Sequence, residues 1–191
     1  RGRHRGQTVA VKQIQDGAED AATEEFMKEL DVMLLMKSEH VIALLGVCLL
    51  PSERGGGLGL VMEFAARGSL DRHLVEADDR LGPVARLQIS EDIAKGLAYL
   101  HSVSILHKDL AARNVLVSAE GACKLADFGL SRVVGVDETY VTTSALPLRW
   151  SAPETLKKKE ATQASDCYML GITLLELYDP GKLPYWQLVS V

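Results

Sequence analysis

Long apolar runs are missing from this sequence of 191 residues. The longest, from Val41 to Leu50, is interrupted by Gly46 and falls well short of the roughly 18 residues that a membrane-spanning helix needs. No signal peptide is visible, although a chain that starts at Arg1 instead of a methionine would not show one. The sequence therefore predicts no membrane segment within these residues.

Basic charge and cysteine are also scarce. The net charge is −5 at pH 7, which argues against a nucleic-acid partner because such partners require clustered lysine and arginine. The cysteines Cys48, Cys123 and Cys167 are odd in number and lack the spacing of metal ligands. We therefore expect reduced cysteines in a cytoplasmic protein, or in the intracellular part of a receptor.

One short stretch carries a set of groups suited to chemistry. Residues 107–114 read His-Lys-Asp-Leu-Ala-Ala-Arg-Asn, so Asp109 lies five positions before Asn114, and Asp127 follows in Asp-Phe-Gly. A carboxylate can accept a hydroxyl proton, and an amide with a second carboxylate can hold Mg²⁺. Phosphoryl transfer needs such groups, because it depends on positioning and charge neutralisation more than on covalent chemistry by the protein.

Five signals occur in the order found in protein kinases: Val9-Ala10-Val11-Lys12, Glu29, the stretch 107–114, Asp127-Phe128-Gly129 and Ala152-Pro153-Glu154. The chain resembles a protein kinase catalytic domain over nearly its whole length. This resemblance implies ATP and Mg²⁺ as cofactors and an α+β, two-lobed fold. We expect residues 1–65 to belong to the small lobe, a sheet with one helix, and residues 66–191 to the larger, mainly helical lobe.

The resemblance also shows what is missing. A glycine-rich phosphate loop should precede the strand of Lys12, but Gly2 and Gly6 do not form one. The helices that should follow Trp186 are missing as well, together with the arginine that pairs with Glu154 in the family. We therefore expect a fragment truncated at both ends, inactive and poorly folded in isolation.

Hydrophobic patterning predicts the elements around the motifs. Alternation in residues 8–14 predicts a strand in which Ala10 and Lys12 share a face. Helices are expected at 24–36, 83–100 and 164–178. Further strands are expected at 58–64, 105–106, 115–117 and 123–126, with a loop at 51–59.

The family resemblance gives these positions roles at an ATP site. Lys12 would hold the phosphates and pair with Glu29, and Ala10 would cover the adenine. Met62 would gate the pocket behind ATP, and Leu116 would form the floor under the adenine. The backbone of residues 63–65, which are Glu63, Phe64 and Ala65, would hydrogen-bond the base.

The catalytic roles follow from the same resemblance. Asp109 would be the base, Arg113 and Asn114 would assist it, and Asn114 and Asp127 would hold the metal. His107 lies beside the acid, but the family uses it as a packed core residue. The other structural positions are Phe128, Glu154 and Asp166, of which Asp166 would anchor the catalytic loop from below.

Two features resemble tyrosine kinases. Position 111 is alanine where serine/threonine kinases carry lysine, and the basic group is Arg113 instead. Pro147 and Trp150 resemble the tyrosine-kinase substrate shelf, so a tyrosine-containing protein substrate is expected. The interval from Tyr140 to Pro147 is about two residues shorter than is usual in tyrosine kinases, which leaves a tyrosine-kinase-like serine/threonine or dual-specificity enzyme open. Lys108, where arginine is usual, leaves a pseudokinase scaffold open too.

Tyr140 is the candidate regulatory residue. It follows Asp127 in a polar segment and has the acidic neighbours Asp137 and Glu138. Phosphorylation would add nearly two negative charges, which Arg132 and Lys108 could receive. Lysine offers a point charge where arginine offers a planar fork, so we expect activation that is weaker than an arginine would give.

Overall fold

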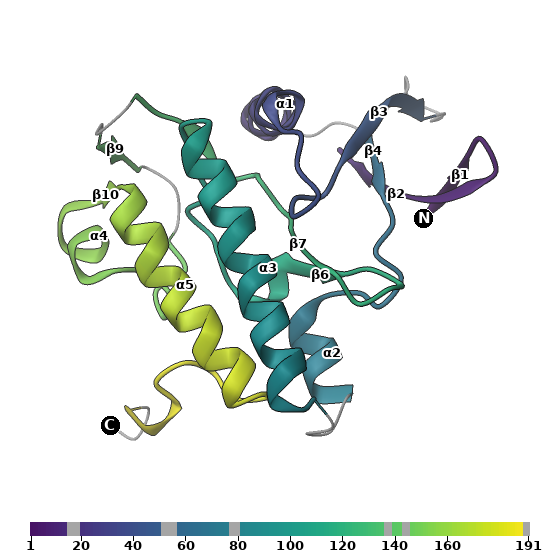
Figure 1. Ribbon diagram of the computed structural model, residues 1–191. Coiled ribbons are helices and arrows are strands. Elements are labelled where there is room, and N and C mark those ends of the chain that lie inside the picture. Colours follow the sequence, from purple (N-terminus) through teal and green to yellow (C-terminus); the bar gives the residue numbers. More distant parts are fainter. Residues whose placement is uncertain (15–19, 51–56, 77–80, 136–138, 143–145, 189–191) are drawn as a thin grey trace.

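The computed structural model describes residues 1–14, 20–50, 57–76, 81–135, 139–142 and 146–188. The fold is α+β, with a four-stranded sheet and one helix in its upper part and most of the helices below (Figure 1). The elements of the upper part are β1 (Gly2–His4), β2 (Gln7–Gln13), α1 (Asp20–Leu35), β3 (Leu44–Leu50) and β4 (Gly57–Glu63). The rest are α2 (Leu70–Glu76), α3 (Pro83–Ser102), β5 (Ile105–Leu106), a 3₁₀ turn (Ala112–Asn114), β6 (Val115–Val117), β7 (Cys123–Leu125), β8 (Arg132–Val133), β9 (Tyr140–Val141), α4 (Pro153–Lys158), β10 (Glu160–Ala161), α5 (Gln163–Tyr178) and a 3₁₀ turn (Trp186–Leu188).

The sheet is antiparallel, in the order β1-β2-β4-β3. Sequence analysis missed β1, which is only three residues long and joins β2 through Arg5 and Gly6. Both turn residues have positive φ, 48° and 82°, as a two-residue hairpin of this handedness requires. β2 lies beside β4, with Ala10 opposite Met62 and Lys12 opposite Leu60.

The prediction of a loop over residues 51–59 was wrong at its end, and residues 51–56 lie outside the described part. β4 already begins at Gly57, and Gly59 pairs with both Gln13 and Cys48. A Cβ on Gly59 would lie 2.9 Å from Val11 Cγ1 and 3.0 Å from Cys48 Sγ. Glycine is therefore present because the sheet is crowded there, and not because the chain turns.

α1 begins four residues earlier than predicted, at Asp20, because its first turn precedes the apolar stripe on which the prediction was based. The buried residues of its stripe are Phe26, Glu29, Val32 and Met33. A glutamate within this stripe is unusual, because burying a carboxylate costs free energy unless it is paired. Its partner lies on β2.

α3 and α5 form the centre of the lower part and lie side by side (Figure 1). α3 starts at Pro83, where the missing N–H has no helical partner to lose. A reciprocal capping box starts α5: Ser165 N donates to Thr162 Oγ1 over 3.2 Å, and Thr162 N donates to Ser165 Oγ over 2.9 Å. Both helices therefore start at positions that their sequences specify.

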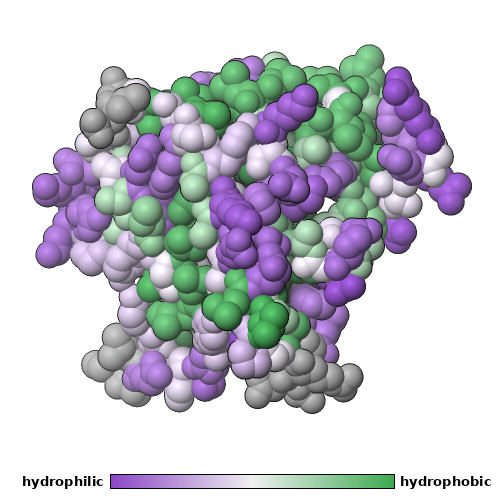
Figure 2. Space-filling model, in the orientation of Figure 1, coloured by the Kyte–Doolittle hydropathy of each residue, from purple (hydrophilic) through white to green (hydrophobic). Residues whose placement is uncertain are grey.

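One apolar core joins the upper and lower parts. It includes Met33 and Phe128, with Leu44 packed against it. Apolar surface also gathers along the upper edge of the molecule, over α1 and the sheet (Figure 2). The exposed large apolar residues of α1 and β3 include Leu34, Leu35, Leu45, Val47 and Leu49. In the described part of the chain, no helix has both the length and the apolar character needed to cross a bilayer.

Candidate active site

Lys12 links the sheet to α1 and to the Asp-Phe-Gly turn. Its ammonium Nζ lies 2.7 Å from both carboxylate oxygens of Glu29 and 3.0 Å from Asp127 Oδ1. Glu29 is 4% exposed, so the buried carboxylate is neutralised by the lysine. The predicted Lys12–Glu29 contact is confirmed.

The pKa values of these groups shift in opposite directions. Burial lowers the pKa of Lys12, but hydrogen bonds and charge from Glu29 and the charge of Asp127 outweigh it, so the net shift is upward. Burial likewise raises the pKa of Asp127, but the charge and hydrogen bond of Lys12 reverse this and leave it lowered. Both groups are therefore charged at neutral pH.

Asp109 has both carboxylate oxygens held by its own loop. Arg113 donates to Oδ1, and Asn114 Nδ2 donates to Oδ2 over 2.8 Å and to the Asp109 carbonyl over 2.7 Å. Arg113 and Asn114 follow Asp109 by four and five residues, and the 3₁₀ turn folds the chain back so that both donor side chains reach Asp109. The carboxylate orientation is thus fixed from within the loop.

His107 is a buried core residue, as predicted. Its ring lies 5.4 Å from that of Phe128, and its Nδ1 accepts from the backbone N–H of Asp109 over 3.3 Å. Burial lowers the pKa of His107, so the ring is neutral at pH 7. A ring that packs on Phe128 and orients the Asp109 backbone matches the structural role predicted for it.

Asp166 holds the catalytic loop from α5. Fully buried, it accepts hydrogen bonds from His107 N over 2.8 Å, from Lys108 N over 2.9 Å and from His101 Nε2 over 3.1 Å. Lys108 has φ of 68°, a left-handed conformation that costs free energy for a residue other than glycine. The bonds to Asp166 offset that cost, and the predicted anchoring contact is confirmed.

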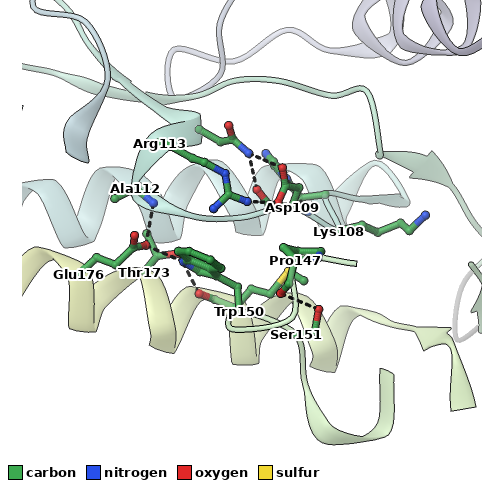
Figure 3. A network of polar contacts seen from close by, with 12 residues as sticks. Lys108, Asp109, Ala112, Arg113, Pro147, Trp150, Ser151, Thr173 and Glu176 are labelled. Carbon is green, nitrogen blue, oxygen red and sulfur yellow. Dashed lines mark hydrogen bonds and ion pairs between the residues drawn. The ribbon is translucent and has the colours of Figure 1, made fainter. Parts of the chain in front are cut away.

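Figure 3 shows a network that sequence analysis missed. Glu176 Oε2 accepts from Ala112 N over 2.9 Å and from Trp150 Nε1 over 2.8 Å. The guanidinium of Arg113 lies 4.5 Å from the ring centroid of Trp150. Trp150 is therefore fixed between α5 and the catalytic loop, beside the turn in which the Pro147 carbonyl accepts from Trp150 N and Ser151 N. Glu176 is a single acidic residue within the apolar run of α5, and this isolated charge is the sequence signal that could have identified it.

The side chain of Glu63, at the end of β4, connects the upper and lower parts of the molecule. Its carboxylate accepts from Ala43 N over 2.7 Å and pairs with Lys124 Nζ on β7 over 2.8 Å. Phe64 and Ala65 follow β4 directly, and Leu116 lies half-buried on β6 across from Ser69. The structure thus brings the residues predicted to surround adenine to the junction of sheet and helices.

The candidate regulatory residues also meet. Lys108 Nζ lies 4.1 Å from the ring centroid of Tyr140, and the Arg132 guanidinium lies 6.0 Å from the same ring. Burial and the positive charge of Arg132 lower the pKa of Lys108 to about 8. Asp137 and Glu138 lie outside the described residues, and Glu154 lies in the first turn of α4.

A cavity of about 250 Å³ brings the chemical groups together. It is lined by residues from β2, α1, the catalytic loop and the Asp-Phe-Gly turn, among them Lys12, Glu29, Asp109, Asp127 and Gly129. A larger cavity, of about 430 Å³, is lined by Ala112 and Arg113 of the same loop, by residues of α2, and by Trp150 and Glu176. The catalytic loop thus contributes residues to both cavities.

Comparison with known proteins agrees with this geometry. The family model described as protein tyrosine and serine/threonine kinase matches residues 1–191. The chain belongs to this family. It is 35% identical to human tyrosine-protein kinase ZAP-70 over 181 residues, which is 93% of this chain, and 34% identical to the mouse protein over the same share. The chain of this kinase spans 28% of the length of either relative.

The residues present fit a magnesium ion. The Asn114 amide nitrogen is used by Asp109, which leaves its carbonyl oxygen as an acceptor, and Asp127 supplies a second hard oxygen ligand. Within the described residues there is no cluster of three or more histidine, cysteine, aspartate or glutamate side chains. Mg²⁺ needs no such cluster, because it is commonly held by one or two protein oxygens, substrate phosphates and water.

Proposed function

We propose that this chain forms the catalytic part of a protein tyrosine kinase, which transfers the γ-phosphate of ATP to a tyrosine hydroxyl of a protein substrate. The observation that carries the proposal is the cavity that unites Lys12, Glu29, Asp109 and Asp127. Its charges have the signs that phosphoryl transfer uses: a cation for phosphate oxygens, and carboxylates for a metal and a proton.

Asp109 would accept the proton of the substrate hydroxyl as the oxygen attacks phosphorus. Its carboxylate is held by Arg113 and Asn114, so little rotation is needed before proton transfer. His107 is not the base in this account, since it is buried behind the loop and in contact with Phe128. Asp109 is the carboxylate that faces the cavity from the catalytic loop.

ATP would lie between sheet and helices. Lys12 would bind the α- and β-phosphates while Glu29 holds its ammonium in place. Ala10 and Leu116 would enclose the adenine, whose edge would meet the backbone of Glu63, Phe64 and Ala65. Met62, the partner of Ala10 across the strands, would border the space behind the base.

Asn114 and Asp127 would hold Mg²⁺, which would supply positive charge against the phosphates. Lys12 contacts Asp127 directly, so the lysine that would bind phosphate lies beside the carboxylate that would bind the metal. Asp127 has φ of 60°, and Gly129 lies close enough that a Cβ there would be 3.6 Å from Asp127 Oδ1. The Asp-Phe-Gly turn therefore presents the carboxylate towards Lys12 and away from the core side, where Phe128 is buried.

Tyrosine specificity is supported by the surface beyond Asp109. Arg113 stacks on Trp150 and pairs with Asp109, and position 111 carries the small side chain of alanine. The ring and the Pro147 turn form a shelf on which a long aromatic residue can lie while its hydroxyl reaches Asp109. Both relatives named above are called tyrosine-protein kinases.

We assign residues 1–65 and 66–191 to the small and large lobes. All four strands of the main sheet lie before residue 65, and the helices α2 to α5 lie after it. Glu63 contacts both parts, through Ala43 and Lys124, as a residue at a lobe boundary would. A cytoplasmic location, free or within a receptor, remains a prediction.

The full-length protein can test the substrate assignment with ATP, Mg²⁺ and a degenerate peptide library. We expect label mainly on tyrosine, with an Ala111→Lys variant shifting some label towards serine and threonine. Labelling of serine and threonine alone would show that the shortened 140–147 interval sets specificity. Nucleotide binding without any transfer would indicate a pseudokinase scaffold.

A further inference from the structure

Lys108 carries a buried positive charge whose ammonium forms no hydrogen bond within the described part of the chain. The residue is 4% exposed, although lysine is rarely buried without a partner. The backbone N–H of Lys108 donates to Asp166, and this bond fixes the part of the loop from which the lysine side chain extends. Some other group must offset the loss of hydration around this ammonium.

That group is the face of an aromatic ring. Nζ lies 4.1 Å from the Tyr140 centroid, well within the range of about 6 Å over which a ring attracts a cation. The attraction comes from the π face and does not need the hydroxyl.

The ring is also fixed on its other sides. Tyr140 pairs with Ala161 in the two-stranded sheet β9–β10, and its ring packs on Leu106, Val134 and Ala161. Directly after β9, Thr142 N donates to the Lys159 carbonyl over 2.8 Å. The strand therefore carries the ring into contact with the residue directly before Asp109.

We propose that the unmodified ring of Tyr140 is a positioning group, which holds β9 on the catalytic loop by covering the Lys108 ammonium without any phosphate. The contact explains why a lysine is buried at this position with no hydrogen-bond partner. It also assigns the covering of Nζ to the ring face and not to a phosphate on the hydroxyl. The consequence for activity rests on the proposed kinase function, whereas the contact itself does not.

The contact has a signature that does not depend on catalysis. A CH₂ group above an aromatic face is shifted upfield, so the ε-protons of Lys108 should be displaced in the NMR spectrum of full-length protein labelled at lysine Cε. The protein is treated with phosphatase first, and mass spectrometry confirms that Tyr140 is unmodified. We expect the displaced signal in the wild type and in Tyr140→Phe, and its loss in Tyr140→Leu.

Hydrogen exchange of the Thr142 amide reports whether β9 is held. Cation–π contacts range from weak at exposed sites to stronger when desolvated, so exchange should be roughly 2- to 30-fold faster in Tyr140→Leu. Lys108→Met, which removes the charge but keeps the ring, should give a similar increase. This second variant decides the matter if the leucine variant does not fold. Tyr178→Leu, far from Lys108 and near Arg86, is the control and should change neither readout.

Activity adds a further comparison. In the unphosphorylated protein, Tyr140→Phe should keep the basal kcat. Tyr140→Leu should lower kcat, and its effect on the KM for ATP should be smaller. An undisplaced Lys108 signal in the wild type, or Thr142 exchange unaffected by Lys108→Met, would overturn the proposal even if the protein is an active kinase. Absence of kinase activity with both structural signatures present would overturn only the proposed function.

Discussion

The anchoring of the catalytic loop by Asp166 gives a prediction that needs no catalytic assay. In Asp166→Asn, one carboxylate oxygen becomes an NH₂ group while the side chain keeps its size. The wild-type carboxylate accepts three hydrogen bonds, two from the backbone N–H groups of His107 and Lys108 and one from His101. An asparagine side chain accepts hydrogen bonds only through its carbonyl oxygen. At least one of the three donors will therefore face the new NH₂ group, which is itself a donor.

The magnitude follows from that count. Hydrogen bonds to charged groups contribute about 1.5–3 kcal/mol each, and a buried N–H left unpaired costs about 1–3 kcal/mol. Losing one such bond and weakening the others should cost about 3 kcal/mol in the free energy of unfolding. This is a large share of the roughly 5–15 kcal/mol that stabilises a typical domain.

Urea unfolding and amide hydrogen exchange of full-length protein measure the two parts of this effect. Asp92→Asn is the matched control, because Asp92 is also buried and accepts from a backbone N–H, that of Cys123, over 2.9 Å. Both variants should lose stability. Only Asp166→Asn should also accelerate exchange of the His107 and Lys108 amides beyond the global loss, by about 100-fold.

Equal protection of these two amides in wild type and Asp166→Asn would refute the reasoning. It would mean that neighbouring packing, and not the carboxylate, holds the left-handed conformation at Lys108. An equal loss in Asp92→Asn would likewise show that the effect is global.

Three further predictions concern other contacts. Glu176→Ala should lower the unfolding free energy by about 2 kcal/mol, because two N–H groups lose their acceptor, whereas Glu176→Gln can keep that oxygen and should cost less; urea denaturation decides this. The pKa of Asp127 is held below its ordinary value of 3.8. The free energy that its ionised carboxylate contributes to folding is therefore fully present above pH 3.8 and is lost as pH falls through the lowered pKa. When the free energy of unfolding is measured in acid titrations, Lys12→Met should remove this pH dependence. Lys108→Arg should raise the ratio of kinase activity between Tyr140-phosphorylated and unphosphorylated protein, measured at equal phosphate occupancy.

The positions of the main elements could be predicted from the sequence where periodicity is strong. The predicted strand at 8–14 lies within one residue of β2, and the predicted helix at 164–178 within one residue of α5. Motif order also predicted contacts between residues far apart in sequence, such as Lys12 with Glu29. Such contacts follow from family resemblance, because no local pattern relates a strand lysine to a glutamate on the next helix.

What could not be predicted depends on tertiary packing. β9 and β10 are two residues each, too short for alternation to be visible, and they exist because the chain brings them together. Gly59 ends a glycine-rich stretch that predicted a loop, but it lies in a crowded part of the sheet. The position of the Tyr140 ring over Lys108 depends on a strand pairing that no local pattern reveals.

Turnover and nucleotide binding by Asp109→Asn and Asp127→Asn test the central claim most directly. With full-length protein, Mg²⁺ and a tyrosine peptide, we expect Asp127→Asn to abolish Mg²⁺-dependent transfer. Asp109→Asn should lower transfer by about 10²–10⁴-fold, the usual contribution of a general base, while ATP binds as in the wild type. Near-normal turnover in both variants would contradict the account, because the residues that converge on the cavity would then have no part in the reaction.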